Sequence, residues 1–241
     1  MPSPAFADRL PLPLHTGRTG LADWALEARL PGRAPDARLP PKLLQDCIDF
    51  LVVLHAAGRD EQARSSLAGA ADVLAPVCAT DADAAAVREL GQGLDETLAD
   101  VPCGFGHGDF WTRNLLADGE RLTGVIDWDG AATGRLPLLD LLHLRLSAHR
   151  EQTRQYIGTA FVEHLLPWAR SGGDDVARAY GRSIELELDA TRLEALATAY
   201  WLDRVASEIA MFSDLADRPM WVRANVHQVI EALSRRPHRS A

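Results

Sequence analysis

The sequence has 241 residues, of which 47% are hydrophobic and 24% charged, so one large domain or two small ones can form with an ample core. The formal net charge of −9 argues against phosphate-led binding of nucleic acid and is compatible with a cationic small substrate. No apolar run reaches the ~20 residues of a membrane span, and the N-terminus lacks the pattern of a signal peptide. We therefore expect a cytoplasmic protein without a nucleic-acid or membrane partner.

The N-terminal region is rich in proline and glycine and shows little periodicity. Two short strands at residues 12–15 and 21–30, with a turn at residues 17–20, predict one β-hairpin. We expect no helix before Glu27. Pro31 and the glycine after it end the second strand, and a linker follows as far as Pro40.

Apolar residues recur at helical spacing along most of the remaining chain. The predicted helices span residues 41–58, 61–74, 83–98, 137–149, 151–169, 174–182, 191–213 and 219–235. Trp201, Phe212 and Trp221 occupy helical positions, and we expect all three in the core rather than in a binding site.

The pattern changes between residues 104 and 128. A glycine-rich segment comes first, and two short strands at residues 114–117 and 121–128 follow, joined through Asp118 and Gly119 in a typical hairpin sequence. The expected fold is mainly α (α+β): a large helical lobe with a small β-hairpin insert and a second hairpin near the N-terminus.

A cluster of polar residues coincides with this insert. Asp109 lies in a loop beside a glycine, Asn114 follows five residues later, and Asp127 comes after an apolar strand. Because an antiparallel hairpin brings its two outer ends together, Asn114 and Asp127 can lie close to each other and offer oxygen ligands of the kind that Mg²⁺ prefers. Asp109 would stand beside them as a second carboxylate.

This layout suits phosphoryl transfer, which requires metal ions to neutralise the phosphates and a carboxylate to orient the attacking hydroxyl group. Protein kinases arrange an Asp, an Asn and a metal-binding Asp in the same order. Asp109, Asn114 and Asp127 could instead be turn and cap residues, but residue type and spacing agree at all three positions.

The complete pattern is HGDxxxxN at residues 107–114, an apolar strand, and Asp-Trp-Asp at residues 127–129. It resembles the aminoglycoside phosphotransferase and choline kinase family, which has a protein-kinase-like fold. The resemblance extends over roughly residues 20–235: residues 27–32 are similar to the family's hinge strand. Gly134, Pro137 and Asp140 are similar to the residues that follow its Asp-Trp motif, with a spacing one residue longer.

The resemblance implies an enzyme that transfers the γ-phosphate of ATP to a hydroxyl group of a small molecule. Asp109 would be the catalytic base, and Asn114 and Asp127 would bind Mg²⁺ and, through it, the nucleotide. His107 would brace the catalytic loop, and Asp129 would be a second metal contact or a polar brace. We expect Asp140 to anchor the loop or cap a helix. The identity of the substrate and the oligomeric state are not readable from the sequence.

The resemblance also implies a phosphate-covering loop, a strand lysine and a helix glutamate ahead of the hinge. About 26 residues precede Glu27, and the chain's single lysine, Lys42, comes after the hinge. We therefore expect residues 1–32 to be a remnant of the small lobe and residues 33–241 to form the large lobe. A fragment or late start, a degenerate protein, and a small lobe supplied by another chain are all compatible with this pattern.

Two other functions remain open. A truncated or degenerate pseudokinase that does not turn over ATP alone would retain the same motifs without the small lobe. A metal-dependent hydrolase could use the same carboxylates.

Overall fold

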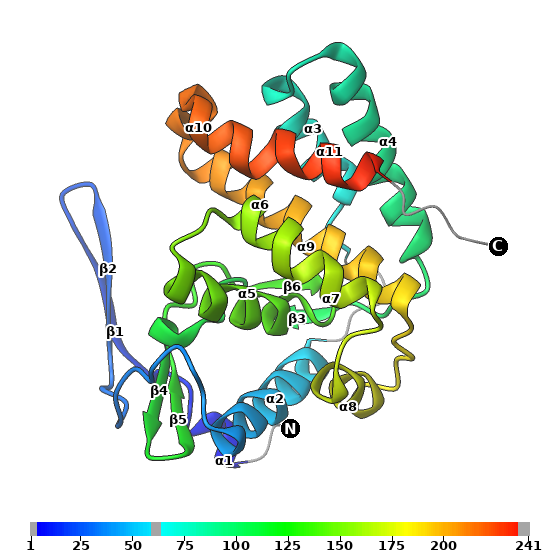
Figure 1. Ribbon diagram of the computed structural model, residues 1–241. Helices are drawn as coiled ribbons and strands as arrows, with labels where there is room; N and C mark the ends of the chain where they lie inside the picture. The colour runs from blue at the N-terminus through cyan, green and yellow to red at the C-terminus, as the bar shows by residue number, and fades with distance from the viewer. Residues whose placement is uncertain (1–3, 59–63, 236–241) are drawn as a thin grey trace.

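The computed structural model describes residues 4–58 and 64–235 and confirms the mainly α fold (Figure 1). The α-helices are α1 (Pro4–Ala7), α2 (Pro41–Ala57), α3 (Leu67–Leu74), α4 (Asp81–Thr97), α5 (Leu139–Thr153), α6 (Ile157–Ala160), α7 (Leu166–Arg170), α8 (Asp175–Ser183), α9 (Ala190–Met211), α10 (Pro219–Val222) and α11 (Gln228–Ser234). Tighter 3₁₀ turns are η1 (Ala75–Val77), η2 (Thr112–Asn114) and η4 (Ser213–Asp217), and wider π turns are η3 (Phe161–Leu165) and η5 (Arg223–His227). The strands form three antiparallel pairs: β1 (Pro13–Thr19) with β2 (Ala22–Glu27), β3 (Gly104–Gly106) with β6 (Ala132–Arg135), and β4 (Leu115–Asp118) with β5 (Arg121–Val125).

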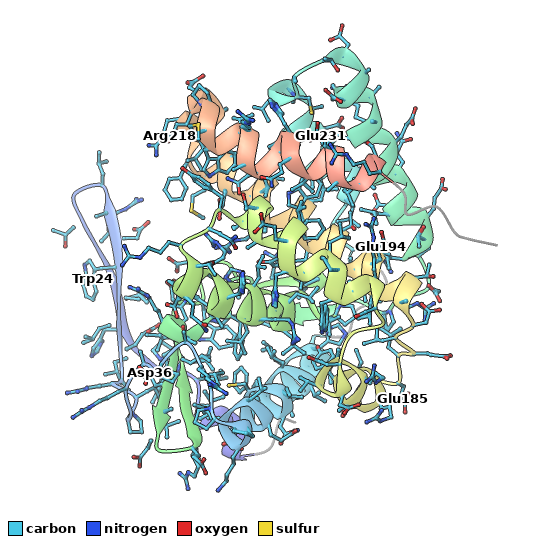
Figure 2. All side chains as sticks on the ribbon, viewed as in Figure 1. Trp24, Asp36, Glu185, Glu194, Arg218 and Glu231 are labelled. Carbon is cyan, nitrogen blue, oxygen red and sulfur yellow. The ribbon has the colours of Figure 1, made fainter. Side chains whose placement is uncertain are left out.

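The N-terminal hairpin stands apart from the helical body, with Trp24 along its length (Figures 1 and 2). The hairpin is confirmed, but its predicted turn is wrong, because β1 continues to Thr19 and the chain reverses at Gly20, where φ is 63°. Gly17 lies within the strand, opposite Trp24. A Cβ atom on Gly17 would come within 2.4 Å of the Trp24 indole, so this glycine serves side-chain packing rather than the turn.

The expectation of no helix before Glu27 is also wrong. The one-turn helix α1 places Phe6 in the core, 6% exposed, where its ring stacks on Phe50 with centroids 4.7 Å apart. Shortly after it, the carbonyl group of Arg9 accepts a hydrogen bond of 2.9 Å from the amide of Val125. The N-terminal segment therefore packs beside β5.

The predicted second helix, at residues 61–74, begins later than expected, with α3 at Leu67; its first three predicted positions lie outside the described residues. The Ser66 side chain caps the helix by accepting a hydrogen bond from the amide of Gly69. The Asp95 carboxylate accepts from the amides of Leu67 and Ala68, each at 3.0 Å. These contacts satisfy the free N–H groups of the first turn and so fix where the helix starts.

The long helix α9 runs through the helical body and packs against α3, α4, α5 and α7 (Figure 1). Trp201, at its centre, is fully buried, and its indole N–H donates to the carbonyl group of Asn225 at 2.8 Å. Trp221 is also buried, as expected. The expectation for Phe212 is wrong: α9 ends at Met211, and the Phe212 side chain is 53% exposed. Among the described residues, no helix is long and apolar enough to cross a membrane.

The predicted hairpin insert is confirmed as β4 and β5, with Leu115 opposite Val125 and Asp118 opposite Arg121. Arg33 forms an isolated bridge to Ala117 along the outer side of β4. The pairing of β3 with β6 was not predicted. β3 is only Gly-Phe-Gly, which is too short to show the alternation of apolar and polar residues that identifies a strand.

Candidate active site

The loop that carries His107 and Asp109 is bound by Asp140, which lies in the first turn of α5. The Asp140 carboxylate accepts hydrogen bonds from the amide of His107 at 2.7 Å and from the amide of Gly108 at 2.9 Å. Gly108 has a φ of 80°, a conformation that favours glycine. Asp140 therefore anchors the loop, as the sequence led us to expect.

The His107 side chain is completely buried between the loop and the end of β5. Its Nδ1 accepts a hydrogen bond from the amide of Asp109 at 3.2 Å, so Nε2 carries the proton and donates to the carbonyl group of Ile126 at 3.0 Å. Its ring centroid lies 4.6 Å from that of Trp128. Burial lowers the pKa of His107, which favours this neutral form. Both ring nitrogens therefore form hydrogen bonds to the backbone of the loop and of the segment after β5, as a bracing role would require.

Asp109 and Asn114 are in direct contact. The Asn114 side-chain nitrogen donates to both the backbone oxygen and the Oδ2 atom of Asp109, each at 2.9 Å. Asn114 is 6% exposed, and its position follows from the 3₁₀ turn η2 that leads into β4. Because the amide nitrogen faces Asp109, the amide oxygen is the atom of Asn114 that suits a metal ion.

Asp127 lies at the same end of the hairpin as Asn114. The amide of Ile126 donates to the carbonyl group of Asn114 at 2.9 Å, so the backbones of residues 114 and 126 are adjacent. Asp127 follows immediately, exposed and with a φ of 64°. Asp129 is exposed as well, two residues further on, so its carboxylate stays a predicted metal contact.

The donor set can be tested against the chemistry of Mg²⁺. Within residues 4–58 and 64–235, no three His, Cys, Asp or Glu side chains are grouped so as to hold a metal ion. Magnesium in nucleotide sites is commonly held by one or two carboxylates together with phosphate oxygens. One exposed carboxylate at Asp127 and the amide oxygen of Asn114 fit that requirement.

Side chains from two helices far along the chain also reach Asp109, and neither residue was predicted from the sequence. His143, on α5, places Nε2 3.1 Å from Asp109 Oδ1, and Arg204, on α9, places Nη2 2.9 Å from the same atom. Burial would raise the pKa of Asp109, but the hydrogen bond from His143 and the charge of Arg204 outweigh it and hold that pKa well below its usual range. The carboxylate is therefore ionised at neutral pH.

The signals for these two residues differ. His143 comes one helical turn after Asp140, so a helical reading of α5 could have placed it near the loop. Arg204 is separated from Gly108 by 96 positions, and no local pattern marks it. A third contact secures the loop's far side: the Thr112 hydroxyl donates to Glu151 of α5 at 3.0 Å.

Comparison with known proteins identifies the family of this chain. Residues 6–182 match the model of the phosphotransferase enzyme family. The chain belongs to the phosphotransferase enzyme family. A search of curated protein sequences finds no match.

Solved structures of other proteins have the same fold. An aminoglycoside phosphotransferase crystallised with ADP and hygromycin B is 19% identical, with a TM-score of 0.53, and the match covers 93% of this chain and 78% of that one. A choline/ethanolamine kinase family protein from Mesorhizobium loti is 17% identical, with a TM-score of 0.58, and the match covers 95% of this chain and 73% of that one. At these identities the likeness establishes the shared kinase-like fold.

Proposed function

We propose that this protein transfers the γ-phosphoryl group of ATP to a hydroxyl group of a small molecule. The observation that carries the proposal is the contact of Asp109 with Asn114, next to Asp127, on a loop that Asp140 and His107 hold in place. A fixed, ionised carboxylate beside a pair of magnesium-type ligands is the arrangement that phosphoryl transfer requires.

In the proposed reaction, the acceptor hydroxyl group donates a hydrogen bond to the Asp109 carboxylate. The hydroxyl oxygen forms a bond to the γ-phosphorus as the bond between that phosphorus and the bridging oxygen breaks, and ADP leaves. The hydroxyl proton passes to Asp109 and then to solvent. Asn114 and Asp127 would hold Mg²⁺, which, when bound, supplies positive charge to the phosphates.

We also propose that the chain divides into a remnant of the small lobe, residues 1–32, and a large lobe, residues 33–241.

The first test is nucleotide binding. We expect calorimetry to detect binding of Mg·ATP to the wild-type protein, and Asp127→Asn to weaken it. Absence of binding even at millimolar Mg·ATP would refute catalysis by this chain alone and favour the pseudokinase alternative.

The second test is turnover. ADP release would be followed by a coupled assay, and products by phosphorus NMR, with a panel of hydroxyl compounds that includes choline, ethanolamine and hygromycin B. We expect Asp109→Asn to lower kcat by at least ~10²-fold while Mg·ATP binding persists, because the variant loses the proton acceptor. Asp118→Asn, at the exposed end of β4, is the matched control and should be unchanged. Phosphatase activity that requires Asp109, with no transfer to any acceptor, would instead favour the hydrolase.

A further inference from the structure

The hydrogen bonds to the Asp109 carboxylate are distributed unequally between its two oxygens. Oδ1 accepts from His143 Nε2 at 3.1 Å and from Arg204 Nη2 at 2.9 Å, whereas Oδ2 accepts from Asn114 Nδ2 at 2.9 Å. An ionised carboxylate offers about four acceptor sites, two on each oxygen. Among the residues that the structure describes, two donors reach Oδ1 and one reaches Oδ2, which leaves one acceptor site on Oδ2.

Arg204 forms hydrogen bonds with both the backbone and a side chain of the loop. Its Nη1 donates to the carbonyl group of Gly108 at 3.1 Å while its Nη2 contacts Asp109, and its Nε lies 3.5 Å from a Glu208 carboxylate oxygen. The Arg204 side chain is 24% exposed. Two nitrogens of one planar guanidinium thus define the position of Asp109 relative to its own loop. A lysine has a single nitrogen and cannot reproduce this geometry.

Asp203, the residue before Arg204 on α9, binds Arg135 at the end of β6. Asp203 pairs with Arg135 Nη1 at 2.8 Å, and Arg135 Nη2 donates to the carbonyl group of Gly130 at 3.1 Å. Consecutive residues of α9 therefore contact the Gly108–Asp109 segment and Arg135, the last residue of β6, which in turn binds the backbone at Gly130. This makes α9 the common support for both sides of the candidate site.

His143 is itself held by a buried hydrogen bond. Its Nδ1 lies 2.8 Å from the Tyr200 hydroxyl oxygen, and both residues are buried. Because the Asp109 carboxylate can only accept, Nε2 of His143 carries the proton and Nδ1 accepts from the Tyr200 hydroxyl. A chain of donors thus runs from Tyr200 through His143 to Asp109, and it fixes the orientation of the imidazole ring.

We propose that Arg204 and the Tyr200–His143 pair are positioning residues that orient the Asp109 carboxylate so that the acceptor hydroxyl group binds to Oδ2. This inference rests on the proposed function, since it assigns the atom that receives the hydroxyl group. Phosphoryl transfer depends on the alignment of the attacking oxygen, and a misplacement of about 1 Å costs on the order of 10²-fold in rate.

The test separates orientation from binding through the split between kcat and KM. We expect Arg204→Lys and His143→Leu to lower kcat roughly 10- to 100-fold with an unchanged KM for Mg·ATP. His143→Gln keeps an N–H donor and should recover part of the rate, and Tyr200→Phe should give a smaller loss. The matched controls are Arg192→Lys, near the start of the same helix, where Arg192 pairs with Asp100, and Tyr180→Phe, at another buried tyrosine. A kcat within twofold of wild type for Arg204→Lys and His143→Leu would overturn the proposal, and so would an effect confined to KM.

A structural readout keeps the inference testable even if the wild-type protein transfers no phosphate. Crystal structures of the wild-type protein and of Arg204→Lys should show the Asp109 carboxylate rotated in the variant. An unchanged orientation would contradict the positioning role, whatever the turnover. Absent turnover in the wild-type protein, with the carboxylate rotated in the variant, would refute the proposed function and leave the positioning role intact. If Arg204→Lys does not fold, Tyr200→Phe and His143→Gln provide the same comparison with smaller changes.

Discussion

The loop at residues 107–114 and the N-terminal hairpin at residues 13–27 are stabilised in different ways. The loop has little regular structure, but side chains from α5 and α9 hold it through hydrogen bonds to Asp140, His143 and Arg204. The hairpin has regular strands, yet nearly every residue in it is exposed. Isolated two-stranded hairpins are marginally stable in water. Regular secondary structure is therefore a poor guide to stabilisation here, because the irregular loop has more contacts with the helical body than the regular hairpin has.

Of the changes to the loop and the hairpin, the one with the largest expected effect is removal of the anchor of the loop. Asp140→Ala deletes a carboxylate that accepts two backbone hydrogen bonds, from His107 and Gly108. Hydrogen bonds to charged groups contribute about 1.5–3 kcal/mol each, so we expect unfolding to become easier by about 3 kcal/mol or more. Urea denaturation measures this change. Asp118→Ala, at an exposed position, is the control, and a loss below about 1 kcal/mol for Asp140→Ala would show that the loop does not depend on this anchor.

Acidification should act on the buried site before the hairpin. Burial lowers the pKa of His143 from its ordinary 6.5, so below about pH 6.5 the unfolded chain binds a proton that the folded protein excludes. Stability should therefore fall as the pH falls, by up to about 1.4 kcal/mol per pH unit for this histidine. The pKa of Asp109 is also lowered, so this carboxylate shifts stability in the same direction, but only below about pH 3.8. Denaturation of wild type and His143→Gln at several pH values checks this, and equal slopes for the two proteins would contradict it.

The smallest effect is expected in the hairpin. Trp24 is 46% exposed, and its indole N–H donates to the Thr19 hydroxyl at 3.2 Å. Because Trp24 contacts Gly17 and Thr19 within the exposed hairpin, outside the buried core, Trp24→Ala should change the global free energy of unfolding by less than about 1 kcal/mol. The same truncation at buried Trp201 should cost about 3–5 kcal/mol. Comparable losses at both positions would mean that the hairpin is an integral part of the folded core.

The contrast between local and distant contacts also explains which features could be predicted from the sequence. Local patterns were enough for most of the longer helices, for the β4–β5 hairpin, and for placing Asn114 near Asp127, because a tight turn links those two residues. They failed where the cause is distant or nonperiodic. Gly17 was assigned to a turn because glycine is common in turns, and its packing against Trp24 becomes visible only once the two strands are paired. Helix α1 is a single turn, which is too short to show a helical period. Arg204 carries no local signal, since its partner lies in a different part of the chain.

The roles of Asp109, Asn114, Asp127, Asp129 and His107 in catalysis and metal binding stay predictions. Their geometry favours those roles, and family membership supports the class of reaction. The prediction for Phe212 failed for another reason: the helical pattern suggested that it is buried, but α9 ends one residue before it.

The backbone of Asp127 affects how its role can be examined. At φ 64° it lies in the left-handed region, where Asn and Asp are far more common than other side chains apart from glycine. Replacement by Ala would remove the carboxylate and also strain the backbone, by roughly 1 kcal/mol or more. A loss of metal affinity in that variant would combine two causes. Asn tolerates the same conformation, so it changes the charge at this position while leaving the main chain free to keep its path.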